Sequence, residues 1–477
     1  MPAYKPTIGL EIHAELKTRT KMFCKSGNDP NERRPNVNVC PVCLAHPGTL
    51  PVINREAVMH VLRVGAALGS QLADYTEFDR KNYFYPDLPK GYQISQYEFP
   101  LVAGGRLAGV EITRVHLEED TASSMHDEGS EETTIDFNRA GVPLMELVTE
   151  PVITSAHKAG EFARELQLLL RYLGASGANM EKGEMRVEAN VSISKDETLG
   201  TKVEIKNLNS FRAMERAVAY EIKRQAESLE RGEKIVQETR GWDESKQKTF
   251  PQRIKEGSAD YRYFPDPDLP SLKLYEIEGC DIQSVVRGLP ELQEARRSRY
   301  KSLGIKSDDA ELYVREAPLG AFFEDVIKSY ADDTERVGLA SNYIANDLVK
   351  IGRDDEGRDT EIQANIPISA VNFNKIIQLL LDKKVSSRGA KDLLSAVVDT
   401  GRDVEDVATE RNLYQTSRVS DLEPIIAKLM QDHSSVVAEY KSGKTAALEY
   451  LVGQGMRALR GSGNPDALRR LILEKIS

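Results

Sequence analysis

Three residues near the start of the chain, Glu11, His13 and Glu15, carry ionisable side chains at intervals of two. In an extended strand this spacing places all three side chains on one face. A carboxylate beside an imidazole can ligate a divalent metal ion. A solvated strand face would show the same pattern, and this motif taken alone favours that simpler interpretation.

Other acidic side chains are crowded in the same part of the chain. They are Glu118, Glu119 and Asp120 next to His116, Glu146 and Glu150 in the apolar segment PLMELVTEPV, and Glu188. Crowded carboxylates repel one another and destabilise a fold unless a cation or a basic group neutralises them. One such cluster would be ordinary, but several within one domain favour a metal or phosphate site as much as a plain acidic surface.

Basic and aromatic residues occur together in the segment FDRKNYFYPDLPKGYQ, which contains Lys81 and Lys90. Further basic residues, Arg186, Lys202 and Lys206, fall on predicted strands. Such residues suit a nucleotide, because Lys and Arg bind phosphate and an aromatic ring stacks on the base. The alternative is an aromatic corner of the core with solvated lysines, and by itself the segment favours it.

The cysteines follow a spacing that is typical of metal sites. Cys40 and Cys43 form a Cys-x-x-Cys motif, and Cys24 lies upstream. Structural zinc sites use four ligands, so one is missing here, and His46 is a candidate for it. Cys280 is distant in sequence and is expected to be a small buried apolar residue. The sequence leaves zinc binding open.

Alternation of apolar and polar residues predicts the strands that would position these side chains. It is clearest over residues 185–193, and it recurs over residues 8–15 and 202–206. This pattern is typical of half-buried antiparallel strands. Apolar residues at helical spacing predict two helices, over residues 157–173 and 212–231.

The pattern changes near residue 290. Beyond that point apolar residues recur at helical spacing throughout, with a charged loop at residues 353–361. Gly401 is the predicted C-cap of a helix and marks a second boundary near residue 405. The sequence therefore predicts an α+β fold: an antiparallel-sheet domain over residues 1–290, followed by two all-helical domains over residues 291–404 and 405–477.

Length and composition limit the class of protein. The chain has 477 residues, of which 40% are hydrophobic and 29% charged, and this balance excludes a mainly disordered or fibrous protein. No stretch approaches the roughly 18 apolar residues of a membrane span, and the first residues do not resemble a signal peptide. With only four cysteines, we expect a protein of the reducing cytoplasm.

The net charge is −11, which argues against a protein that coats nucleic acid with its whole surface. Residues 441–477 are an exception, because they carry seven basic and three acidic side chains, a balance of +4. The candidates for RNA contact in this tail are Lys444, Arg457, Arg460, Arg469 and Arg470. A solvated helix face is the default interpretation of any one of them.

Long segments of the chain resemble one known family. They include GLEIHAELKT, CPVCLAHPGTLPV, FDRKNYFYPDLPKGYQISQ, HLEEDT, DFNRAGVPLMELVTEP, EIKNLNSFR and DYRYFPDPDLP, and later YLVGQGMRALRGSGNPDALRRLILEKI. Together they resemble the B subunit of the aspartyl/glutamyl-tRNA(Asn/Gln) amidotransferases over nearly the whole chain. The resemblance implies a cradle-shaped, kinase-like domain, a helical domain and a helical tail that meets tRNA.

The resemblance also implies a heterotrimer, in which the partners are an amidase (the A subunit) and a small protein (the C subunit). In this family ATP phosphorylates the side-chain carboxylate of Glu-tRNA(Gln) or Asp-tRNA(Asn). Ammonia that the amidase releases from glutamine then displaces phosphate, which gives Gln-tRNA(Gln) or Asn-tRNA(Asn). ATP and Mg²⁺ are the implied cofactors, and the sequence leaves open which product is formed.

Family motifs suggest a role for individual residues. The candidates for the metal site and the ammonia gate are Glu11, His13, Glu118, Glu119 and Glu150. Lys81 is the expected basic partner of Glu119 at the tunnel mouth. Nucleotide or substrate binding is expected of Lys90, Arg186, Glu188 and Lys206. Because histidine is an unusual magnesium ligand, His13 would orient other groups rather than ligate.

Two positions depart from the family pattern. Ser26 stands where zinc-bearing members have the second cysteine of a Cys-x-Cys pair, so any zinc bound by Cys24, Cys40 and Cys43 is expected to be structural. Glu188 stands where the family usually has aspartate, and its extra methylene moves the carboxylate by about 1.5 Å.

Two other functions stay open as alternatives. A non-catalytic tRNA-binding adaptor would not need the acid–base clusters of the strand segments. A self-sufficient glutamine amidotransferase would need its own glutaminase motif, and the sequence contains neither a Gly-Gly-Ser-Ser run nor a Gly-x-Cys-x-Gly segment. Both observations favour the B-subunit interpretation.

Overall fold

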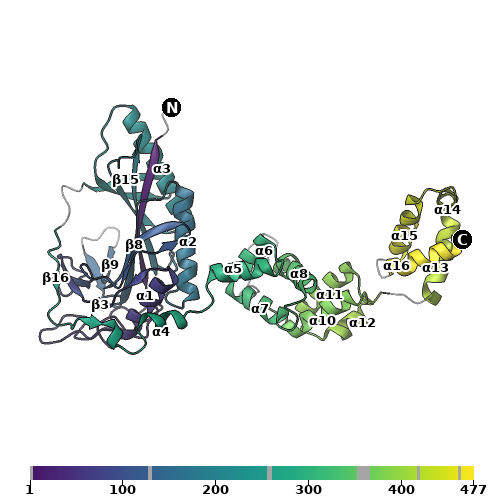
Figure 1. Cartoon of the computed structure of the whole chain (residues 1–477), viewed down its shortest axis with the longest axis horizontal. Coiled ribbons are helices and arrows are strands. Elements are labelled where there is room, and N and C mark those ends of the chain that lie inside the picture. Colours follow the sequence, from purple (N-terminus) through teal and green to yellow (C-terminus); the bar gives the residue numbers. More distant parts are fainter. Residues whose placement is uncertain are drawn as a thin grey trace. The chain divides into compact units, whose positions relative to one another are not determined.

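The computed structural model describes residues 4–126, 132–254, 260–351, 366–415, 419–459 and 464–476. The chain divides into two compact units, Met1–Gln293 and Glu294–Ser477 (Figure 1), close to the boundary predicted near residue 290. The first unit contains the sheets, and the second is built from helices, which confirms the predicted α+β class. Among the described residues, no helix is long and apolar enough to cross a bilayer.

One large sheet forms the centre of the first unit. Its strands are β1 (Lys5–Glu15), β2 (Gln71–Leu72), β6 (Val102–Ala103), β7 (Arg106–Leu107), β8 (Val110–Glu119), β11 (Pro143–Thr149), β12 (Met185–Ser194), β13 (Val203–Leu208), β14 (Glu238–Asp243) and β15 (Lys248–Ile254). Their order is β15-β14-β13-β12-β1-β11-β8-β6-β2, and β7 pairs with β8. The pairing is antiparallel except between β13 and β14. The three strands predicted from alternation are confirmed.

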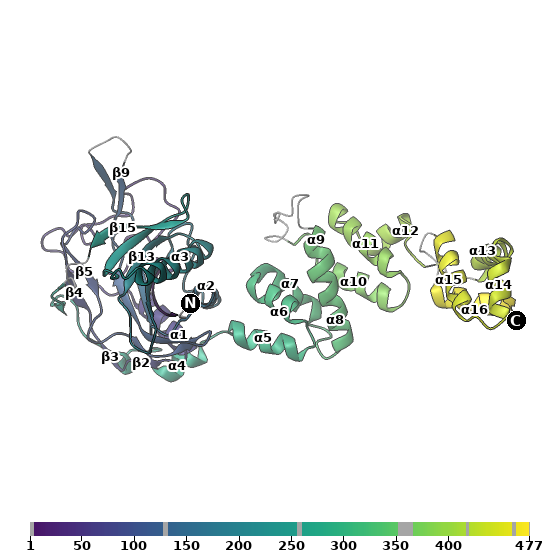
Figure 2. The ribbon, with the colours of Figure 1, turned by 90° about the horizontal axis from the view of Figure 1, so that it is seen from above.

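Two long helices lie on one side of this sheet (Figures 1 and 2). They are α2 (Ala156–Tyr172) and α3 (Phe211–Glu230), and each begins after a serine whose hydroxyl accepts a backbone N–H, as an N-cap does. Both lie within one residue of their predicted ranges. Their apolar residues form one core with alternate strand residues such as Ile8, Leu10 and Ile12. The opposite, polar face of the sheet is left for the candidate site.

Shorter strands lie on the side of the sheet away from α2 and α3 (Figure 2). β4 (Asp79–Asn82), β5 (Tyr92–Ser95) and β16 (Phe264–Pro265) form a three-stranded sheet, and β5 contacts β8. The other elements of this unit are β3 (Tyr75–Thr76) paired with β17 (Leu272–Lys273), β9 (Ser123–His126) paired with β10 (Thr133–Asp136), α1 (Arg55–Ala67), η1 (Leu274–Glu276) and α4 (Ile282–Arg287).

The described regular elements of the second unit are all helices. Its first part comprises α5 (Gln293–Ser302), α6 (Ser307–Arg315), α7 (Ala317–Ile327), α8 (Thr334–Asn342), the π-helix η2 (Tyr343–Leu348), α9 (Val349–Ile351), α10 (Ala370–Leu381), α11 (Ser387–Thr400) and α12 (Val404–Glu410). Gly401 caps α11 with a φ of 64°, as predicted, because glycine adopts this left-handed backbone without steric penalty. The predicted loop at residues 353–361 lies outside the described residues.

The C-terminal tail has a core of its own. Its helices are α13 (Val419–Asp432), α14 (Ser434–Lys441), α15 (Ala446–Ala458) and α16 (Pro465–Ile476), and residues of α13, α15 and α16 form one apolar cluster. By contrast, α12 packs against α10 and α11, and Tyr414 forms a backbone bridge with Val385. The chain through Gln415 thus packs with the preceding helices, so the tail begins later than the predicted boundary near residue 405.

Candidate active site

Strand pairing brings ionisable side chains into one row across the large sheet. His13 in β1 lies opposite Glu146 in β11 and Arg186 in β12. Glu146 in turn lies opposite His116 in β8. Residues in register share a face of the sheet, as do residues two apart, such as Glu11 and His13. All five side chains therefore lie on the polar face.

His13 lies among three carboxylates. Its Nε2 atom is 3.4 Å from Glu146 Oε2, 3.5 Å from Glu118 Oε1 and 4.0 Å from Glu11 Oε1. Glu146 Oε2 is also 3.5 Å from His116 Nε2. Two groups of potential metal ligands result, each with its ligand atoms within 4.8 Å of one another: Glu11, His13 and Glu146, and His116, Glu118 and Glu146. Glu146 belongs to both.

Burial and mutual repulsion perturb the ionisation of this cluster. Burial alone would lower the pKa of His13, but the three surrounding carboxylates raise it to about 9, so the imidazole is protonated at neutral pH. Burial and the charge of Glu146 raise the pKa of Glu11 to about 7, and burial raises the pKa of Glu118. Burial lowers the pKa of His116 to about 4. Neighbouring carboxylates raise the pKa of both His13 and Glu11, and a group of carboxylates this close together favours binding of a divalent cation.

Lys81, in β4 of the three-stranded sheet, faces the same cluster. Burial would lower its pKa, but the negative charges of Glu118 and Glu146 raise it. Its Nζ atom lies 5.1 Å from the centre of the Tyr261 ring. Lys81 is therefore a charged ammonium held between carboxylates and aromatic rings, where it can donate hydrogen bonds to phosphate oxygens.

The polar face of the large sheet borders a cavity of about 670 Å³, which we call the charged cavity. Its volume is in the range of small-molecule sites. Besides the His13 cluster and Lys81, it is lined by the predicted binding residues Arg186, Glu188 and Lys206. Glu188 forms an ion pair of 2.9 Å with Lys206 and belongs to neither group of potential metal ligands.

Glu119 lies on the other side of β8 from Glu118, because successive strand residues alternate between faces. Its carboxylate accepts hydrogen bonds from Lys90 Nζ at 2.8 Å and from the backbone N–H of Ile94 at 2.9 Å. The predicted pair of Lys81 with Glu119 is therefore wrong. Glu119 pairs with Lys90, and Lys81 faces Glu118.

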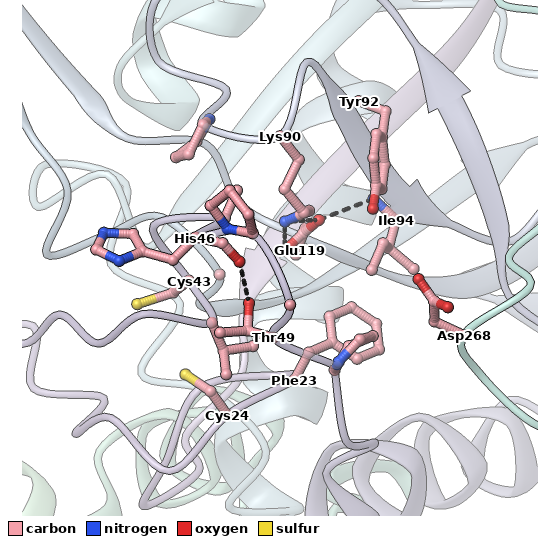
Figure 3. A pocket seen from close by; sticks show the side chains of 17 residues that line it. Phe23, Cys24, Cys43, His46, Thr49, Lys90, Tyr92, Ile94, Glu119 and Asp268 are labelled. Atoms are coloured by element: carbon pink, nitrogen blue, oxygen red, sulfur yellow. Dashed lines mark hydrogen bonds and ion pairs between the residues drawn. The ribbon is translucent and has the colours of Figure 1, made fainter.

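A second cavity, of about 280 Å³, lies beside the Lys90–Glu119 pair. Figure 3 shows that Cys24 and Cys43 lie around the same space as this ion pair, and we call it the cysteine-side cavity. Glu118 lines the charged cavity, whereas Glu119 lines the cysteine-side cavity. The C-terminal end of β8 thus separates the two cavities.

Glu150 lies outside both cavities. It directly follows β11, beside an irregularity where β8 has an extra residue relative to β11. Its carboxylate accepts a hydrogen bond of 2.7 Å from the hydroxyl of Thr113. Glu150 was predicted as a candidate for the metal site, but the structure places it elsewhere. The reason is that β11 ends before this residue.

The three cysteines predicted to ligate zinc lie together. The sulfur atoms of Cys24, Cys40 and Cys43 are within 4.8 Å of one another, and His46 does not belong to this group. The side chain of Ser26 lies 3.8 Å from Cys43 Sγ. A hydrogen bond from Cys24 lowers the pKa of Cys43 to about 4, as suits a metal-binding thiolate. Among the described residues, three of the four ligands of a structural zinc site are present.

Basic residues of the tail are partly engaged in ion pairs. The pairs are Lys444 with Glu439 at 2.8 Å, Arg469 with Glu449 at 3.0 Å, and Arg470 with Glu474 at 4.0 Å. Arg457 is exposed on α15, and Arg460 lies outside the described residues. The tail therefore presents a surface whose positive charge is partly neutralised.

Several side chains that line the charged cavity received no individual role from the family motifs, although some of them belong to the crowded acidic segments. They include Glu146, His116, Arg114, Asp120 and four tyrosines. Arg114 lies 3.4 Å from Glu146 and Asp120 lies 2.6 Å from Arg186. The signal that was available for Glu146 is its place in the apolar strand PLMELVT, because a buried carboxylate is costly without partners.

Comparison with known families matches two segments of the chain. Residues 6–278 match a family described as the GatB/GatE catalytic domain, and residues 321–476 match one described as the GatB domain. The first match covers the sheet-containing unit that holds the charged cavity. The second covers most of the helical unit.

Whole-length relatives are also similar. The B subunits of the aspartyl/glutamyl-tRNA(Asn/Gln) amidotransferases from Thermomicrobium roseum and Thermus thermophilus are each 44% identical, and each match covers 99% of both chains. The chloroplastic/mitochondrial B subunit of the glutamyl-tRNA(Gln) amidotransferase from Sorghum bicolor is 39% identical over 99% of this chain and 87% of its own. The chain therefore belongs to the B-subunit family of tRNA-dependent amidotransferases.

Proposed function

We propose that the charged cavity phosphorylates the side-chain carboxylate of Glu-tRNA(Gln) and Asp-tRNA(Asn) with ATP and then converts it to the amide. The observation that carries this proposal is the arrangement of Lys81 opposite the row of His13, Glu146 and His116. Such a site holds anions of both substrates close together, since its cations offset their repulsion. The names of the relatives from Thermomicrobium and Thermus support both tRNA substrates.

The reaction has two steps because ammonia cannot expel oxide from a carboxylate. An oxygen of the substrate carboxylate attacks the terminal phosphorus of ATP, so an acyl phosphate and ADP are formed. Ammonia then attacks the acyl carbon, and the bond to the phosphate oxygen breaks. The nitrogen loses a proton to water, and the products are the amide and inorganic phosphate.

Residues of the charged cavity have separate roles in this proposal. Glu11, Glu118 and Glu146 offer the oxygen ligands that Mg²⁺ prefers, and His13 orients them. When bound, Mg²⁺ would offset negative charge on the phosphate oxygens. Lys81 and Lys206 donate hydrogen bonds to the phosphates, and Lys81 stabilises the charge that shifts onto the transferred group.

We propose that the ammonia comes from a separate amidase, the A subunit of a heterotrimer that also holds a small C subunit, and passes the Lys90–Glu119 pair. The relatives are named as B subunits, which supports an assembly. The ion pair lines the cysteine-side cavity at the end of β8, where the adjacent Glu118 lines the charged cavity. In this position it can regulate passage of a small neutral molecule from one to the other.

Removing both charges of this gate should uncouple the two half-reactions. Changing Lys90 alone would leave Glu119 buried without its partner, which destabilises a protein, so we use the double variant Lys90→Met/Glu119→Gln. We expect amidation driven by glutamine to fall severalfold in the assembled complex, while amidation driven by added ammonium is retained. Equal losses with the two nitrogen donors would contradict the gate and indicate a role in phosphoryl transfer.

We propose that the C-terminal tail binds the tRNA backbone. Deleting the chain from Val419, which spares the helices through α12, should raise the KM for tRNA and leave glutamine hydrolysis by the complex unchanged. Raising salt should weaken binding with a shallow slope, because few phosphates are neutralised. Arg457→Gln should act in the same direction, whereas Arg388→Gln, at an exposed position of α11, is the matched control. An unchanged KM for the deletion at two salt concentrations would contradict tRNA binding by the tail.

Zinc binding by Cys24, Cys40 and Cys43 is proposed as structural only. Since the fourth cysteine position holds Ser26, the remaining ligand would be its hydroxyl or water. Metal analysis of the purified complex tests this, and loss of zinc from a Cys43→Ser variant is the expected result. All four cysteines of the chain are free thiols, which supports the proposed cytoplasmic location.

Substrate-dependent ATP hydrolysis tests the proposed function. The assembled complex is given ATP, Mg²⁺ and ammonium with Glu-tRNA(Gln), Asp-tRNA(Asn) or the same tRNAs without an amino acid. We expect ADP and amidated product only with the aminoacylated tRNAs. A complex that binds both tRNAs but hydrolyses no ATP would instead be a tRNA-binding adaptor.

A further inference from the structure

Five tyrosine rings form a continuous row beside the charged cavity. In order they are Tyr97, Tyr263, Tyr261, Tyr83 and Tyr85, and we call them the aromatic ridge. Tyr97 and Tyr263 are stacked, with centres 4.5 Å apart and planes 11° from parallel. The remaining neighbours meet edge to face at 6.1, 5.8 and 5.9 Å. The first four rings line the cavity itself.

The backbone that carries Tyr261 and Tyr263 is held in place by hydrogen bonds. The side chain of Asn82 donates hydrogen bonds to the carbonyl oxygens of Tyr261 and Arg262, at 3.2 and 2.8 Å. Arg262, between the two tyrosines, has a φ of +47°, a left-handed backbone that is costly for a residue with a side chain. Strain of this kind persists only where surrounding contacts impose it, and it is common at ligand sites.

Parts of the ridge are far more exposed than core aromatics. Tyr97 is 59% exposed and Tyr85 is 57% exposed, and their neighbour Phe84 is 88% exposed. Aromatic rings turned to solvent beside a cavity offer flat surfaces on which bases can stack. Packing alone therefore does not explain the outer rings.

We propose that the aromatic ridge stacks the unpaired bases at the 3′ end of the aminoacyl-tRNA. This inference rests on the proposed function, in which the reacting carboxylate is attached to the terminal nucleotide. Lys81 connects the two regions, because its Nζ atom is 5.1 Å from the Tyr261 ring centre and it faces Glu118 and Glu146. A terminal base stacked on Tyr97, whose ring lines the charged cavity and is 59% exposed, would place its aminoacyl group over the charged residues.

The length of the ridge favours RNA over ATP as its occupant. ATP has one base and needs one ring face, whereas the ridge continues from the cavity to exposed Tyr85 and Phe84. The unpaired end of a tRNA offers several successive bases, and single-stranded RNA is commonly bound by stacking on such rings. Stacking also tolerates different bases, as an enzyme with two tRNA substrates requires.

Base stacking can be measured without any reaction. We use the assembled complex and deacylated tRNA(Gln) in which 2-aminopurine replaces the terminal adenine. The fluorescence of 2-aminopurine is quenched when it stacks on an aromatic ring. We expect quenching with the unaltered complex and with Tyr97→Phe, which keeps the ring. Quenching should be lost in Tyr97→Leu/Tyr85→Leu. Tyr275→Leu is the matched control, since Tyr275 is 60% exposed in η1 and lines neither cavity.

Kinetics then separate the two possible bases. In the double leucine variant we expect the KM for Glu-tRNA(Gln) to rise about tenfold, with the KM for ATP unchanged. A rise in the KM for ATP alone would assign the ridge to the adenine of ATP and overturn the proposal. Unchanged quenching and unchanged KM values would show that the rings only pack. If the unaltered complex did not amidate Glu-tRNA(Gln), the proposed function would be wrong. The fluorescence measurement of base stacking would still be valid, because it needs no reaction.

Discussion

Replacing Glu146 with glutamine is expected to reduce ATP-dependent amidation by about a hundredfold or more. Glu146 belongs to both groups of potential metal ligands and lies 3.4 Å from the imidazole of His13. Glutamine keeps the shape but removes the negative charge, so both groups lose a carboxylate at once. The measurement is the amidation rate of the assembled complex with ammonium as nitrogen donor, over a range of Mg²⁺ concentrations.

Glu150→Gln is the matched control for this experiment. It removes the same charge in the same part of the chain. However, Glu150 lies outside both cavities, where its carboxylate accepts a hydrogen bond from the hydroxyl of Thr113. We expect a nearly unchanged amidation rate. If Glu150→Gln were the more damaging of the two, the metal site would include the residue after β11 and our assignment of Glu146 would be wrong. Glutamine hydrolysis by the partner amidase should persist in both variants.

Replacing Lys81 with methionine is expected to lower amidation by about a hundredfold, equally with glutamine and with ammonium. Lys81 lines the charged cavity with Glu118 and Glu146, so in the proposed reaction its loss removes a cation that stabilises the transferred phosphate. Methionine retains much of the apolar stem, so packing changes little. The rate of ADP release dependent on Glu-tRNA(Gln) reports the phosphorylation step directly.

The Lys90→Met/Glu119→Gln variant is the comparison for Lys81→Met. It removes a lysine from the cysteine-side cavity, and added ammonium should restore its amidation. If ammonium restored amidation to Lys81→Met instead, Lys81 would belong to the ammonia gate, as the sequence had indicated. Together the two variants distinguish a lysine of the phosphoryl site from a lysine of the gate.

Strands with strict alternation were predictable because their signal is local. In β1 and β12 every second residue is apolar and packs in the core, and the residues between them include Glu11, His13 and Glu188. The sequence could therefore place these side chains on a polar face. It could not show which strands lie side by side, because pairing joins residues that are far apart in the chain.

For that reason Glu146 was counted among the crowded carboxylates but was not assigned as a metal ligand. β11 is buried along most of its length, so its sequence is almost continuously apolar and shows little alternation. Its role depends on lying opposite His13 on one side and His116 on the other. Neither relation can be read from a single segment.

The wrong partner for Glu119 has a similar origin. Lys81 and Lys90 occur in one motif, and Glu118 and Glu119 are adjacent, so the sequence does not determine which lysine meets which carboxylate. The alternation of β8 decides it, since it directs Glu118 to the charged cavity and Glu119 to the cysteine-side cavity. The pair depends on how β4, β5 and β8 are placed, which is a tertiary property.

The position of β1 in the sheet has a genetic consequence. β1 pairs along nearly its whole length with β12, and its residues 11–15 also pair with β11. Its two faces differ, since one packs in the apolar core and the other lines the charged cavity. An in-frame deletion of one codon near Gly9 would shift the register by one residue and exchange the faces. His13 and Glu11 would then enter the apolar core of the domain, while Ile12 and Leu10 would face the charged cavity. We therefore expect single-codon deletions here to behave as null alleles, even where most missense changes at exposed positions are tolerated.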